Sequence, residues 1–163
     1  MKRLRNTSGI SDTTVRQVCD WITVDLCIAG FDVECRKSTS KLAGRAYTKG
    51  SAYHSTARPF VVLRVGTESR WPLAKRADLK TVRRFPCTVA PYQYAQHKGK
   101  RYVLANRIEA LVYIAAHELR HLFQAKCLWP RYHGSKGRFS EVDTEAYAIH
   151  MLRQWRKTLE SAH

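Results

Sequence analysis

Residues 117–121 of this chain read H-E-x-x-H, and they lie within residues 106–127, whose pattern predicts a long helix. Positions i and i+4 of a helix share a face, so His117 and His121 can direct two imidazoles to one metal ion. Glu118 lies about 100° round the helix from His117, where it can reach a water on that ion without binding the ion itself. The fold must therefore bury one side of this helix and present a site on the other.

The helix predicted over residues 106–127 has a core stripe and a second, polar face. Asn106 predicts its start, with Glu109 as the capping-box partner three residues later. The core stripe comprises Ile108, Leu111, Val112, Ala115, Leu119 and Leu122. His117 and His121 fall nearly opposite this stripe, which a helix that only fills a core does not explain. We interpret the second face as one that presents a site.

A following helix, predicted to start at Ser140, offers a third ligand. Its apolar stripe begins with Glu141 and Glu145 and continues through Ala148, Leu152, Trp155 and Leu159. Carboxylates on such a face need a partner or a metal. A hydrolytic zinc site has three protein ligands and an open position, so Glu141 is predicted to bind the metal and Glu145 to accept a hydrogen bond from a ligand imidazole. Asp143 falls on the far side and is predicted to help Ser140 cap the helix.

This spacing resembles that of the gluzincin metallopeptidases, whose H-E-x-x-H helix is followed by a helix with a glutamate ligand. Glu141 stands 20 residues after the second histidine of the motif. Residues 141–148, E-V-D-T-E-A-Y-A, are similar to the E-x-x-A-D-x-F-A pattern of small members of the group. The resemblance implies that Glu141 is the ligand and Glu145 the acid that orients a histidine. Thr144 replaces the usual alanine, and Glu145 replaces the usual aspartate or asparagine.

A second resemblance offers another third ligand. His133-Gly134, twelve residues past the motif, is similar to the H-G that carries the third ligand in Spartan-type (SprT-like) proteases, which cut proteins crosslinked to DNA. That assignment would leave Glu141 and Glu145 on an apolar face without a role, so we favour Glu141. His133 then becomes, with Tyr132 and Tyr147, a candidate to stabilise an oxyanion.

The rest of the chain predicts an α+β fold in one domain, residues 1–163. The expected architecture is a zincin-like core: an N-terminal helix, a small twisted sheet, the H-E-x-x-H helix and the following ligand helix. Residues 36–59 are basic and short of large apolar side chains, which predicts a loop or extended hairpin. The other predicted elements are a helix over 11–30 and strands over 31–35, 60–65, 83–90 and 100–105.

Positive charge is concentrated in residues 36–101, which hold sixteen Lys or Arg against Glu68 and Asp78, a net charge of +14 out of +16 for the chain. Such a field attracts polyanions, and nucleic acid is the usual one. The segment predicts contact with DNA or RNA. The first candidate residues for that contact are Lys37, Lys41 and Arg45.

Composition bears on location. No run of residues approaches the roughly 18 apolar residues that a membrane-spanning helix needs. The first residues contain no apolar stretch of a secretory signal. The five cysteines form no C-x-x-C pair, as in proteins that keep their thiols reduced. We therefore expect a cytoplasmic protein without membrane contact.

These features predict a zinc-dependent metallopeptidase that hydrolyses a protein or peptide substrate. Zinc lowers the pKa of a bound water toward about 7, and Glu118 is predicted to be the general base that takes its proton. The alternative is a basic nucleic-acid-binding module in which zinc only holds two helices together. Glu118 distinguishes the two, because a structural site needs no unligated carboxylate beside the metal.

Overall fold

The computed structural model describes residues 1–38, 42–47, 58–66, 71–76, 101–127 and 140–161. Its strands are β1 (Leu4–Asn6), β2 (Asp32–Ser38), β3 (Ala43–Tyr47), β4 (Phe60–Gly66), β5 (Leu73–Arg76) and β6 (Arg101–Leu104). Its helices are α1 (Asp12–Leu26), α2 (Arg107–Cys127) and α3 (Ser140–Glu160). The mixed α+β class predicted from the sequence is confirmed.

Four strands form a mixed sheet in the order β1-β2-β4-β3, and β5 pairs with β6 in a separate antiparallel ribbon. β1, β2 and β4 run parallel, whereas β3 runs antiparallel to β4. In β4 the register places Val61 opposite Ala46, and Leu63 opposite Gly44. β3 is therefore the outer strand on one side of the sheet, and α2 packs against both β3 and β4.

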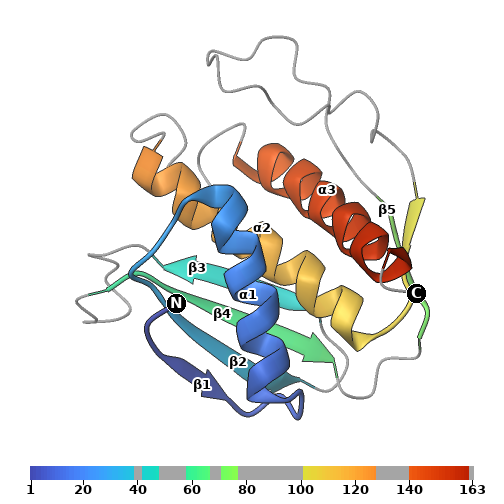
Figure 1. Cartoon of the computed structure of the whole chain (residues 1–163), viewed down its shortest axis with the longest axis horizontal. Coiled ribbons are helices and arrows are strands. Elements are labelled where there is room, and N and C mark those ends of the chain that lie inside the picture. Colours follow the sequence, from blue (N-terminus) through green and yellow to red (C-terminus); the bar gives the residue numbers. More distant parts are fainter. Residues whose placement is uncertain (39–41, 48–57, 67–70, 77–100, 128–139, 162–163) are drawn as a thin grey trace, which may run out of the picture.

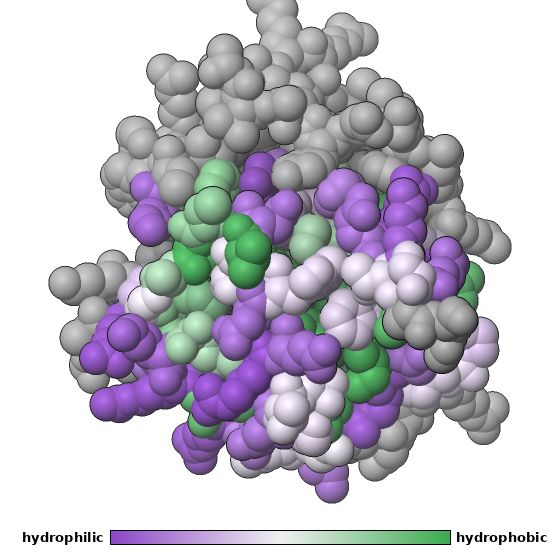
Figure 2. All heavy atoms as spheres, viewed as in Figure 1, coloured by the Kyte–Doolittle hydropathy of each residue, from purple (hydrophilic) through white to green (hydrophobic). Residues whose placement is uncertain are grey.

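The core lies between one face of this sheet and the helices (Figure 1). Val61, Leu63 and Val65 of β4 point into this core, as the two-residue period of a strand requires. On the other face of β4, Val62 is also buried and Arg64 is exposed. α1 packs against α2, and α3 runs along α2. Figure 2 shows the helix-bearing side, where hydrophilic side chains lie between hydrophobic ones.

The helix that carries the motif, α2, begins as predicted. Asn106 Oδ1 accepts hydrogen bonds from the backbone N–H groups of Ile108 and Glu109, which the first turn leaves without helical partners. Glu109 accepts from the backbone N–H of Ala105. The predicted core stripe is buried except for Ile108, which is partly buried, and Ala110, Tyr113, Ile114 and Ala116 are buried as well. The core is wider than one stripe because α2 is enclosed by the sheet, α1 and α3.

Other elements differ in extent from the prediction. α1 starts after Ser11, whose side chain caps it, but ends at Cys27 in the left-handed conformation rather than at Gly30. β2 continues beyond Cys35 to Ser38. Residues 36–59 were predicted to form a loop or an extended hairpin. Their described part instead holds the end of β2 and the strand β3, and these two strands pair with opposite sides of β4.

Three strands, β1, β3 and β5, were not predicted, because none contains a long β-branched run. The strand predicted over residues 83–90 lies outside the described residues. None of the described helices is both long and apolar enough to cross a membrane.

Candidate metal centre

His117 and His121 of α2 and Glu141 of α3 converge on one point. His117 Nε2 lies 3.4 Å from Glu141 Oε2, and His121 Nε2 lies 3.4 Å from Glu141 Oε1. The ligand atoms of the three residues all lie within 4.8 Å of one another. Both imidazoles are largely buried, whereas the Glu141 side chain is 59% exposed. Solvent can therefore reach the cluster from the Glu141 side.

The spacing of these donors suits one small cation. Two donors bound tetrahedrally at about 2.1 Å lie about 3.4 Å apart, and each imidazole nitrogen lies 3.4 Å from one of the two oxygens of Glu141. Two imidazoles and one carboxylate also match a donor set found in hydrolytic zinc sites, with a position left for water. The residues present therefore fit a metal ion.

Charge couples these three residues. The hydrogen bonds with His117 and then with His121 lower the pKa of Glu141. Burial works to lower the pKa of His121, but Glu141 and Glu118 raise it overall. Protons on these rings would leave when a cation takes their place.

Glu118 lies next to the cluster without joining it. Its side chain is buried, and the backbone N–H of Ala46 in β3 donates a hydrogen bond to the carboxylate. Burial raises the pKa of Glu118, although the charges of His117 and His121 oppose that effect. A carboxylate held beside the donors but outside the set is suited to accept a proton.

Gly44 leaves the space that Glu118 occupies. A Cβ added to Gly44 would lie 2.5 Å from Glu118 Oε1 and 2.7 Å from Cδ, with Cγ also too close. Strand β3 thus contacts Glu118 in two ways: Ala46 donates a hydrogen bond to the carboxylate, and Gly44 leaves room for it. The sequence analysis missed this role of Gly44, because it depends on contact between a strand and a distant helix.

Glu145, predicted to accept a hydrogen bond from a ligand imidazole, lies near His117 and is held by two tyrosines. Its Oε1 accepts a hydrogen bond from Tyr102 of β6 at 2.9 Å, and its Oε2 accepts a very short one from Tyr113 of α2. Oε2 is 3.8 Å from His117 Nδ1, which is longer than a hydrogen bond. Among the described residues, His117 Nδ1 is a buried polar atom without a hydrogen-bond partner. If these two side chains moved together by about 1 Å or less, His117 Nδ1 would form the predicted hydrogen bond with Glu145.

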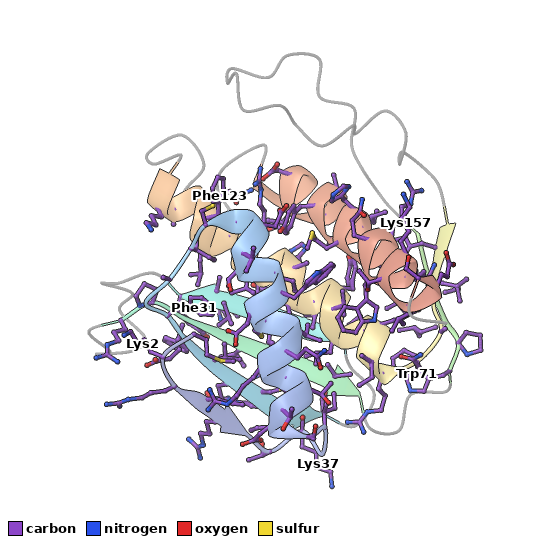
Figure 3. All side chains as sticks on the ribbon, viewed as in Figure 1. Lys2, Phe31, Lys37, Trp71, Phe123 and Lys157 are labelled. Carbon is purple, nitrogen blue, oxygen red and sulfur yellow. The ribbon has the colours of Figure 1, made fainter. Side chains whose placement is uncertain are left out.

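A buried polar network supports His121. Arg120 and Asp143, both almost fully buried, form an ion pair with N–O distances of 2.6 and 3.0 Å. Gln124 Nε2 donates to Asp143 Oδ2 at 2.7 Å, and Gln124 Oε1 lies 3.1 Å from His121 Nδ1. Arg120 also packs over the ring of Phe123, at the α2 end labelled in Figure 3.

Two predictions about α3 need correction. Glu141 is exposed at the first turn and does not lie in the core as the apolar stripe predicted. Asp143 is 4% exposed and pairs with Arg120 of α2, so it does not lie on the far side of α3. The helical periodicity of α3 alone predicts the far side, whereas α2 covers the turn that carries Asp143. The sequence did contain one indication of this pairing: Arg120 and Gln124 are polar residues in a largely apolar helix, and such residues need polar partners when they are buried.

The structure describes only three of the other predicted site residues. His133, Tyr132 and Lys41 lie outside the described residues. Lys37 is exposed at the end of β2 and points away from the fold (Figure 3), and Arg45 is exposed on β3. Tyr147 is completely buried and donates to Asp25 at 2.9 Å, so its role is packing of α3 against α1.

Thr144, which departs from the gluzincin pattern, lies at the cluster. Its hydroxyl donates to the backbone carbonyl of Glu141 at 2.9 Å and is 3.3 Å from His117 Nε2. The hydroxyl therefore fits between the first turn of α3 and the histidine.

Comparisons of the chain with protein-family models, curated proteins and solved structures found no match.

Proposed function

We propose that this chain is a zinc-dependent peptidase with a zincin-like core, in which His117, His121 and Glu141 hold Zn²⁺ and Glu118 is the general base. The observation that carries the proposal is that three ligand groups converge on one point, while the buried carboxylate of Glu118 lies beside them and is not one of the ligands. A structural zinc site has no need for that carboxylate. This order of N-terminal helix, sheet, motif helix and ligand helix supports the zincin-like reading.

The chemistry follows from the placement of the side chains. When bound, zinc would lower the pKa of a water and polarise a carbonyl. Glu118 would hold a proton taken from water and pass it to the leaving amine. Burial of Glu118 keeps bulk water from competing for that proton. Tyr102 and Tyr113 would fix Glu145, which in turn limits rotation of the His117 ring.

A peptide is the favoured substrate. The H-E-x-x-H motif with its free glutamate is the pattern of metallopeptidases. In addition, β3 is the outer strand of the sheet order, and Gly44 and Ala46 of this strand lie against Glu118. An extended peptide lying along β3 would therefore bring its backbone next to the general base.

The protein is expected to bind close to one zinc ion per chain, and Glu141→Ala should weaken binding more than His133→Ala. The reason is that Glu141 contacts both histidines of the cluster. Elemental analysis of the purified protein gives the stoichiometry, and competition with a chelator gives the relative affinities.

Either of two results would contradict this assignment. A chain that neither retains nor takes up zinc has no such site. A larger loss with His133→Ala than with Glu141→Ala would instead assign the third ligand to His133, in the Spartan-type arrangement. Glu160→Ala, at the far end of α3, is the matched control and should leave zinc affinity unchanged.

We also propose a second activity, contact with nucleic acid, which the outer face of the sheet favours. Arg5 and Arg64 are exposed there and Arg36 is half-buried, and the register places Arg36 beside Arg64. Glu34 is shared between two of them, at 3.5 Å from Arg5 and 2.6 Å from Arg36. The one negative charge of Glu34 leaves these three arginines with a net positive charge, which attracts anions. Phosphate groups would supply such anions.

Binding to a labelled single-stranded oligonucleotide should weaken with salt, with a log–log slope of about −0.7 per phosphate neutralised. Changing Arg5, Arg36 and Arg64 to Glu should reduce both affinity and slope and leave zinc content unchanged. The matched control changes three exposed basic residues on the helix side, Arg16, Arg153 and Lys157, to Glu. Equal losses in the two triple variants would mean that net charge alone, and not this face, causes binding.

A further inference from the structure

His121 has a hydrogen-bond partner on its own helix, one turn away. Gln124 Oε1 lies 3.1 Å from His121 Nδ1, and the other end of the same amide, Nε2, lies 2.7 Å from Asp143 Oδ2. Gln124 is 1% exposed, so neither end of the amide can be satisfied by bulk water. The amide therefore bridges α3 to a ring of the metal cluster.

The direction of this amide is determined by Asp143. The carboxylate of Asp143 is paired with the Arg120 guanidinium and offers hydrogen-bond acceptors. Gln124 must turn its N–H₂ group toward such a group, because an oxygen in that place would face another oxygen inside the protein. The Gln124 oxygen is thereby directed to His121. An oxygen of this kind can only accept, so Nδ1 of His121 must carry the proton.

We propose that Gln124 is a positioning residue that keeps the His121 Nδ1 protonated and leaves Nε2 as the nitrogen that binds the metal. Asp143 and Arg120 hold Gln124 in the orientation that this requires. The inference rests on the proposed metal site and adds a function for three buried residues that the peptidase mechanism does not use. In this arrangement the first turns of α3 serve the whole cluster: Glu141 contacts both rings, Asp143 acts on His121 through Gln124, and Glu145 lies beside His117.

The two histidines are therefore supported differently. His117 Nδ1 faces a carboxylate, Glu145 Oε2 at 3.8 Å, whereas His121 Nδ1 faces a neutral amide. A carboxylate near a ligand imidazole makes it a stronger donor to the metal than an amide does. Metal affinity should thus depend on both supports, and each can be removed separately.

The experiment uses Gln124→Met, which keeps the length of the side chain and removes both hydrogen bonds. In the parent with ¹⁵N-labelled histidine, NMR should show a His121 Nδ1–H proton protected from exchange with water, both without metal and with zinc. In Gln124→Met this protection should be lost, and zinc affinity should fall about 10–100-fold. Circular dichroism checks the fold, and Gln124→Asn, too short to bridge both partners, replaces the variant if it does not fold.

Two controls make the outcomes distinct. Gln17→Met, on the exposed side of α1, should change neither signal nor affinity. Glu145→Gln should alter the His117 signals and leave the His121 proton protected. An unprotected His121 proton in the parent, or an unchanged proton and affinity in Gln124→Met, would overturn the role of Gln124. If the parent protein shows a protected His121 proton but takes up no zinc, the role of Gln124 would be supported and the proposed function overturned.

Discussion

Replacing Glu118 with glutamine is expected to abolish peptide hydrolysis while the fold and zinc content stay unchanged. An amide cannot take a proton from water, and a general base typically contributes about 10²–10⁴-fold to the rate. The glutamine oxygen can still accept the hydrogen bond from the backbone N–H of Ala46, so the side chain should keep its place. Cleavage of fluorescently labelled casein, measured beside zinc content, tests the expectation.

Thermal stability separates loss of a base from loss of the fold. Burial raises the pKa of Glu118, which means that the protein environment disfavours its charged form. A neutral amide removes that cost, so the melting temperature of Glu118→Gln should equal or exceed that of the parent. Glu34→Gln, on the opposite face of the sheet, serves as the control and should keep full activity. If Glu118→Gln cleaved casein at the parental rate, another group would have to be the base.

Local patterns along one helix were enough to predict much of the site. The four-residue spacing of His117 and His121 places both rings on one face whatever surrounds the helix. Asn106 defines the start of α2 through its own side chain, which is also a local effect. Glu141 was first singled out by its place on the apolar stripe of the following helix, which the structure corrects, and then by the resemblance that its distance from the motif carries. The inferences for His117, His121 and Asn106 needed only neighbours in sequence.

Contacts between distant elements explain what the sequence analysis missed. The ion pair of Arg120 with Asp143 exists because α3 covers one side of α2, and no single-helix pattern contains that information. β3 has small and polar residues, and it is a strand because β4 provides a hydrogen-bonding partner. Gly44 gains its importance from the approach of Glu118, 74 positions further along the sequence. Those contacts surround the site, and they determine how accurately its groups are held.

Gly44→Ala is expected to reduce hydrolysis about 100-fold, the size of loss that a displacement of about 1 Å can cause. The new methyl group would lie 2.7 Å from Cδ and 2.5 Å from Oε1 of Glu118, so the carboxylate must move. The methyl group would also press on Cγ, which a rotation of the carboxylate alone cannot relieve. Zinc content should not change, because the ligands lie on α2 and α3 and not on β3. The same casein assay and elemental analysis measure both quantities.

Ala43→Val is the matched control for Gly44→Ala, since neighbouring residues of a strand point to opposite faces. It adds bulk to β3 on the side away from Glu118 and should leave the rate near the parental value. A double-mutant cycle gives the sharper test. If Gly44→Ala acts by moving Glu118, it should cost almost nothing more in a protein that already carries Glu118→Gln, because both changes remove the same function. Additive losses would show instead that the methyl group disturbs substrate binding along β3, and that the position of Glu118 is not what Gly44 protects.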